Sequence, residues 1–103
     1  MRANLEQPPT LIFSVRLDRE RSLIVNHSSL RRFQEATGID PVTNAEAITD
    51  LREIILLIWA FAAESDPAVT PITIADHLTL EAVQTISSQV QHYACKTKEG
   101  GAN

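Results

Sequence analysis

The longest apolar run in the chain spans residues 54–63, and its pattern predicts a buried helix. The run, Ile-Ile-Leu-Leu-Ile-Trp-Ala-Phe-Ala-Ala, contains no charged side chain and no helix breaker. When it is extended towards the N-terminus, apolar residues recur with the three-four spacing of one helical face: Ile48, Leu51, Ile55, Ile58 and Ala62. We therefore expect a central helix over residues 44–64.

Local signals set the ends of this central helix. Thr43 and Glu46 have the spacing of a capping box at its start. Pro67 ends the helix, because proline disfavours helical geometry in the residue before it. A shorter first helix that breaks near Thr49 is an equal alternative.

The opposite face of the central helix is acidic at both ends and apolar in the middle. It carries Glu46, Asp50, Glu53, Leu57, Ala60 and Glu64. Since the helix is apolar nearly all round, Leu57 and Ala60 are covered either by other helices or by a partner. The pattern favours internal cover and leaves both alternatives open. The uncharged run is too short for a membrane span, which needs about 20 residues.

Residues 10–26 alternate between apolar and polar positions and predict a β-hairpin. Leu11, Phe13, Val15 and Leu17 share one face of the first strand, with a period of two. A charged turn at residues 18–21 leads to a second β-prone run at 22–25. A two-stranded hairpin is marginal alone, so it must lie on the helices or gain strands from another chain.

The other helices are predicted by their capping residues. Asn26 and Gly38 bracket a helix over 27–37, Thr70 and Pro71 begin one over 71–77, and Thr79 begins one over 80–96. Residues 1–9 are expected to form a flexible tail and 98–103 a frayed tail. The fold class is therefore mainly α with a small N-terminal β-hairpin (α+β), a compact bundle of about four helices in one domain over 10–97.

Charge is unevenly distributed along the chain and argues against nucleic-acid binding. Residues 1–37 carry six Arg against four acidic residues, whereas residues 38–95 carry one Arg against eight. Binding to phosphates needs clustered Lys and Arg, so the acidic helical part fits a basic partner surface better. The single Cys95 excludes an internal disulfide, and residues 1–9 lack an apolar secretion signal, which favours the cytoplasm.

The polar residues do not form a recognisable catalytic, cofactor or metal motif. His92 and Cys95 are three residues apart, but a structural zinc site needs four ligands and no second pair follows. Ser28 and Ser29 have no elbow motif around them and suit the start of a helix. The three glycines cannot form a phosphate loop. We expect a protein that is not an enzyme and that has no catalytic residues, cofactor or metal.

Residues 70–90 have the outline of a DNA-reading helix-turn-helix, which gives an alternative function as a transcriptional regulator. A recognition helix should present basic or amide side chains to DNA. Residues 80–95 contain no Arg or Lys, and Glu81 at the start would repel phosphate. The electrostatics therefore disfavour this alternative.

Three short motifs, in order, resemble a known family. They are Thr37-Gly38 at the end of a helix, Leu57-Ile58-Trp59-Ala60 in the central helix, and Asp66-Pro67-Ala68-Val69-Thr70 after it. The chain resembles the small tail assembly chaperones of long-tailed bacteriophages and gene transfer agents over about residues 11–95. It departs from the family at residues 33–35, where Phe-Gln-Glu stands in place of the common Leu-Glu, and in the charged turn at 18–21.

This resemblance implies a non-catalytic adaptor that holds tail tube or tape measure protein during tail assembly in the cytoplasm of the bacterial host. The residues of the central helix suggest a binding surface of this kind. An apolar strip of Leu57 and Ala60, with an acidic rim of Glu53 and Glu64, would suit a basic amphipathic helix. Trp59 is a candidate anchor, with simple core placement of Leu57 and Trp59 as the alternative. A second partner hypothesis is a homo-oligomer formed through the hairpin edge. No membrane or nucleic-acid partner is expected.

Overall fold

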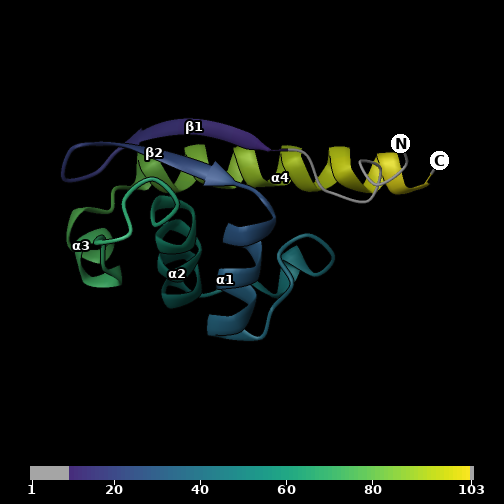
Figure 1. Ribbon diagram of the computed structural model, residues 1–103, viewed down its shortest axis with the longest axis horizontal. Coiled ribbons are helices and arrows are strands. Elements are labelled where there is room, and N and C mark those ends of the chain that lie inside the picture. The colour runs from purple at the N-terminus through teal and green to yellow at the C-terminus, as the bar shows by residue number, and fades with distance from the viewer. Residues whose placement is uncertain (1–9, 103) are drawn as a thin grey trace.

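The computed structural model describes residues 10–102 and consists of a two-stranded hairpin followed by helices (Figure 1). The elements are β1 (Leu11–Arg16), β2 (Glu20–Val25), α1 (His27–Thr37), the 3-10 helix η2 (Ala45–Ala47), α2 (Leu51–Ala62), α3 (Pro71–His77) and α4 (Leu80–Ala102). The expected fold class, mainly helical α+β, is confirmed. The expected tail at residues 1–9 lies outside the described residues.

The hairpin lies on the helices through the face that its alternation predicts. β1 and β2 pair antiparallel, with Phe13 opposite Leu23 and Leu11 opposite Val25. Leu23 and Val25 are buried, whereas Ile12 on the outer face is 64% exposed. β1 runs beside α4, and β2 packs on α1 and α2 (Figure 1). The helices therefore provide the support that an isolated hairpin lacks.

Helix α1 begins and ends at the residues that the capping signals predict. The Asn26 side chain accepts a hydrogen bond from the Ser29 backbone N–H, and the Ser29 hydroxyl accepts one from the Asn26 N–H. At the other end Gly38 adopts φ 81°, a left-handed conformation that glycine tolerates without a Cβ clash.

The prediction of one continuous helix over 44–64 is wrong, and the alternative break near Thr49 is confirmed. The segment forms the short η2, and α2 begins at Leu51. The Asp50 carboxylate accepts from the Glu53 N–H, and the Glu53 carboxylate accepts from the N–H groups of Thr49 and Asp50. This Asp50–Glu53 capping box, rather than Thr43 and Glu46, starts the helix because it supplies partners for the first backbone donors.

Helices α3 and α4 begin where predicted, but α4 is longer than expected. The Thr70 hydroxyl caps α3, and the Thr79 hydroxyl accepts from the Ala82 N–H at the start of α4. No proline interrupts residues 80–102, and α4 continues to Ala102 past the other helices (Figure 1). The expected end near Lys96 and the frayed tail are therefore wrong for residues 98–102, while Asn103 lies outside the described residues. Within residues 10–102, no helix is both long and apolar enough to span a bilayer.

The hydrophobic core is organised around the C-terminal half of α2, as the apolar run predicts. Ile58, Phe61 and Ala62 are fully buried. Side chains from β2, α1, α3 and α4 complete this cluster: Leu23, Phe33, Ile74 and Ile86. Burying a side chain such as Ile58 or Phe61 contributes about 1.5–3 kcal/mol, so this half of α2 contributes strongly to stability.

Candidate functional site

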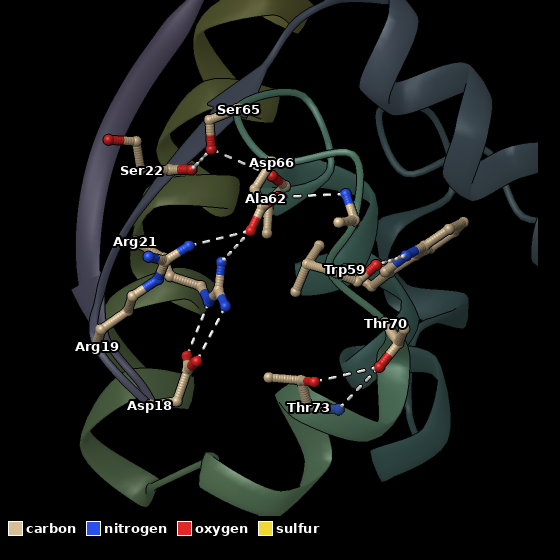
Figure 2. Close-up of polar contacts among 12 residues, drawn as sticks. Asp18, Arg19, Arg21, Ser22, Trp59, Ala62, Ser65, Asp66, Thr70 and Thr73 are labelled. Carbon is tan, nitrogen blue, oxygen red and sulfur yellow. Dashed lines mark hydrogen bonds and ion pairs between the residues drawn. The ribbon is translucent and has the colours of Figure 1, made fainter.

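Asp66, in the loop between α2 and α3, is the centre of a polar junction with the hairpin turn. Its carboxylate accepts hydrogen bonds from Arg19, at 3.1 Å, and from Arg21, at 2.9 Å. Arg21 also donates from Nε and Nη2 to the two oxygens of Asp18, at 2.8 and 2.9 Å (Figure 2). The Arg21 side chain is only 8% exposed. The junction therefore fastens the turn between β1 and β2 to the end of α2.

Electrostatics keep this junction ionised. Hydrogen bonding from Arg21 lowers the pKa of Asp18 from 3.8 to about 2. Arg21, followed by the Ala68 backbone N–H, also lowers the pKa of Asp66. The pKa of Arg21 is raised, first by Asp18, because each ion favours the charged form of the other. The charges are satisfied within the chain, so the junction has a structural role.

Trp59, on α2, contacts the same α2–α3 loop and does not form part of an exposed strip. Its side chain is half-buried, and its indole N–H donates to the Val69 carbonyl at 3.2 Å (Figure 2). Nearby, the Ser65 hydroxyl donates to the Ser22 carbonyl at 2.9 Å. Trp59 therefore holds the α2–α3 loop against α2, as the alternative of core placement expected.

Glu53 and Glu64, the predicted acidic rim, are used inside the chain. Glu53 caps α2. The Glu64 carboxylate accepts hydrogen bonds from Arg32, Asn26 and Ser28 at 2.6, 3.2 and 3.0 Å. Burial raises the pKa of Glu64, but these hydrogen bonds outweigh burial and its pKa lies below the ordinary value. Glu64 therefore links α1 to the end of α2.

The predicted exposed strip of Leu57 and Ala60 is wrong. Leu57 is 5% exposed and Ala60 is fully buried. Helix α1 packs against α2 at this point, and Arg32 donates to the Ala60 carbonyl at 3.1 Å. Other elements of the chain therefore cover these positions, which is the internal cover that the pattern favoured. Of the five predicted site residues, Leu57 lines a hollow at the surface.

That hollow, which we name the α2–α4 groove, is an open depression of about 300 Å³. It lies between the segment containing η2, the first half of α2 and the middle of α4. Five of its lining residues are apolar: Ile48, Ile54, Leu57, Ile86 and Val90. Three are polar: Glu46, Ser87 and Gln91.

Helical spacing and the break before α2 explain how this groove forms. Ile54 and Leu57 are three apart on α2, and Ile86 and Val90 are four apart on α4, so each pair presents one ridge. Because the chain breaks before Leu51, Ile48 approaches from a separate segment and closes one side. The sequence revealed Leu57 only, since the continuous helix expected over 44–64 left no room for a third wall.

The charge around the α2–α4 groove is acidic. Among the described residues that line it, Glu46 alone is charged, and its side chain is exposed. Glu46 makes no ion pair with another side chain that the structure describes. Leu51, 59% exposed, lies one turn before Ile54 and extends the apolar surface. The groove thus offers an apolar floor with one acidic edge.

The Ser and His residues considered as catalytic or metal-binding candidates do not come together in a site among the described residues. The Ser28 hydroxyl donates to Glu64, and the Ser29 hydroxyl donates to the Asn26 carbonyl. The His77 ring lies 3.1 Å from the Thr73 carbonyl. Across the described part of the chain, no three His, Cys, Asp or Glu residues are grouped as metal ligands would be, and the Cys95 side chain lies outside that part.

Comparisons with protein families, curated proteins and solved structures each found no match for this chain. The residues that carry the phage-tail resemblance have identifiable structural roles. Gly38 ends α1, Trp59 binds the α2–α3 loop, Asp66 joins the hairpin and Thr70 caps α3. The motifs therefore report on this arrangement of helices.

Proposed function

We propose that this protein is a non-catalytic tail assembly chaperone of a phage or prophage, which holds tail tube or tape measure protein in the cytoplasm of the bacterial host. The observation that carries the proposal is the α2–α4 groove, an open apolar depression with an acidic edge. The order of the three sequence motifs supplies the choice of partner class.

The size of the groove fits a reversible holding role. A hollow of about 300 Å³ accepts a few side chains rather than a whole domain. A contact made by only a few side chains buries little area, which is typical of weak, transient protein interfaces. A chaperone must release its partner as the tail assembles, so moderate affinity serves it better than a permanent interface.

The same surface is poorly suited to DNA, the alternative partner. Helix α4 buries Ile86, Val90 and Tyr93, and residues 80–93 contain neither Arg nor Lys. The groove edge carries Glu46, which repels phosphate. An apolar, acidic-edged groove favours a polypeptide with apolar and basic side chains.

Co-expression with the tail tube and tape measure proteins encoded in the same genomic neighbourhood tests this function. We expect one of them to co-purify with the full chain and to stay soluble only in its presence. Failure of the folded chain to capture either protein would overturn the proposal. Salt-sensitive gel shift of phage DNA in the micromolar range or tighter would instead favour the regulator.

A further inference from the structure

We propose that the α2–α4 groove binds one amphipathic helix of the partner. The apolar face of that helix lies against the half-buried Ile48 and Ile54, over the floor formed by Leu57, Ile86 and Val90, and a Lys or Arg of the helix lies beside Glu46. This inference rests on the proposed function, because it describes the partner segment that the chaperone would hold. The same groove would also recognise such a helix in another partner class.

The walls of the groove favour a helix over an extended strand. Side chains of α2, α4 and the η2 segment line it, and the backbone donors and acceptors within helices already bond to one another. An extended segment lying there would find no sheet edge to satisfy its own backbone groups. A helix satisfies these groups internally and needs to offer only side chains.

The ridges in the groove also match the surface of a helix. Ile54 and Leu57 on one wall, and Ile86 and Val90 on the other, repeat at one-turn spacing. Leu57, Ile86 and Val90 are buried and form the floor of the groove, so side chains three or four apart on an incoming helix would pack over this floor and against the half-buried Ile54. Leu51, exposed one turn before Ile54, allows the contact to continue along α2.

Charge selects a helix with a basic edge. Residues 38–95 carry eight acidic residues and one cation, Arg52, which is two residues from Ile54 and points to another side of α2. Two arginines of the hairpin and α1 are engaged within the chain: Arg21 pairs with Asp18 and Asp66, and Arg32 pairs with Glu64. The exposed Glu46 has no such cation among the described side chains, so its carboxylate is available to a Lys or Arg of the partner.

A synthetic probe tests the groove directly. The probe is a fluorescein-labelled Leu/Lys amphipathic peptide of about 18 residues, long enough to form a helix, and its counterpart has Glu in place of every Lys. In fluorescence anisotropy we expect the Leu/Lys peptide to bind with a Kd of order 10 µM and the Leu/Glu peptide at least about tenfold more weakly. Equal binding of both peptides would overturn the charge selection.

Neighbouring serines on α4 provide a matched pair of variants. Both serines are exposed, but Ser87 lines the groove whereas Ser88 projects about 100° away on the same helix. Ser87→Phe should fill the groove and weaken peptide binding by about tenfold or more, while Ser88→Phe should remain within about twofold of wild type. Equal affinities for the two variants, with unchanged circular dichroism, would overturn the groove as the binding site.

Charge reversal supplies an independent test. Glu46→Lys should weaken the Leu/Lys peptide by about threefold to tenfold at low salt, and the loss should shrink as salt is added. Asp76→Lys changes the net charge equally but lies on α3, away from the groove lining, and should have a smaller effect. Equal losses would mean that overall charge, rather than Glu46, governs binding, and would overturn the assignment of Glu46.

Tail-protein capture separates failure of this inference from failure of the proposed function. If wild type captures a tail component and Ser87→Phe captures it equally, the groove assignment fails and the chaperone role stands. If wild type captures none but discriminates the peptides through Ser87, the chaperone role fails and the groove stands. Peptide-independent dimerisation that Ser87→Phe abolishes would assign the groove to a second copy of this chain and overturn the helix of a partner.

Discussion

The two halves of α2 have opposite surroundings, although apolar residues are the majority in both. In the C-terminal half, Ile58, Phe61 and Ala62 are fully buried. In the N-terminal half, Leu51 is largely exposed and Ile54 is half-buried at the groove. A domain of this size buries only about two thirds of its unfolded surface, so one apolar helix can exceed the cover available. The C-terminal half stabilises the fold, and the N-terminal half leaves apolar surface exposed beside the groove.

Truncation of one apolar side chain in each half of α2 should give the largest difference in the free energy of unfolding. Phe61→Ala removes a fully buried ring and should lower the free energy of unfolding by about 3–5 kcal/mol. Ile54→Ala, at the half-buried groove wall, should lower it by less than about half of that amount, because water already reaches the site. Urea denaturation followed by circular dichroism measures both. Equal losses would remove the contrast between the two halves.

Loss of Arg21, which joins β2 to the loop after α2, should have the next largest effect on the free energy of unfolding. Arg21→Met should lower the free energy of unfolding by about 1–2 kcal/mol, since it leaves Asp18 and Asp66 without their main cation, although both are partly exposed to water. Arg19→Met changes an exposed side chain that binds the same Asp66 and should cost no more than about 1 kcal/mol. Urea denaturation at neutral pH measures both variants. Equal losses of stability would mean that the burial of Arg21 makes no difference.

Acid should weaken the junction of Arg21 with Asp18 and Asp66. The resulting loss in the free energy of unfolding should not exceed the loss caused by Arg21→Met. Both carboxylates have lowered pKa values in the folded chain, so folding favours their ionised forms. Their contribution is complete above the ordinary value of 3.8 and is lost as the pH falls through about 2, the pKa of Asp18. The urea midpoint of wild type should therefore fall across this window more steeply than that of Arg21→Met. Parallel pH profiles would contradict the prediction.

Substitution of Leu51 should have the smallest effect on stability. Leu51→Ser changes a largely exposed residue and should alter the free energy of unfolding by no more than about 0.5 kcal/mol. Thermal denaturation would measure this. The same variant should bind the Leu/Lys peptide more weakly, because Leu51 extends the apolar wall. A strong loss of stability would place Leu51 in the core and erase the division of α2.

Locally encoded parts of the fold could be predicted from the sequence. Asn26 and Gly38 fix the ends of α1, and Thr70 fixes the start of α3, because a cap depends on residues within one turn. The alternation in β1 likewise depends only on its own residues. The break before α2 was one of two alternatives, since Glu46 and Glu53 both follow a capping residue by three positions.

The long-range contacts and the site could not be predicted in this way. Arg21 and Asp66 are 45 residues apart, and neither lies in a pattern that identifies its partner. The groove joins Ile48, Leu57 and Ile86 from three separate segments, so only the assembled chain defines it. Glu64 looked available in sequence because the reach of Arg32 from α1 has no periodic signature.

The position of Trp59 makes it an optical reporter of one region only. It is the single tryptophan of the chain, and its indole contacts the Val69 carbonyl in the α2–α3 loop. Since it follows Leu57 by two residues, it projects about 200° around α2 from that groove residue. Its emission should shift to the red when acid opens the junction, and should stay unchanged while a peptide occupies the groove. A change in Trp59 emission on peptide binding would show that occupation of the groove alters the structure on the opposite side of α2.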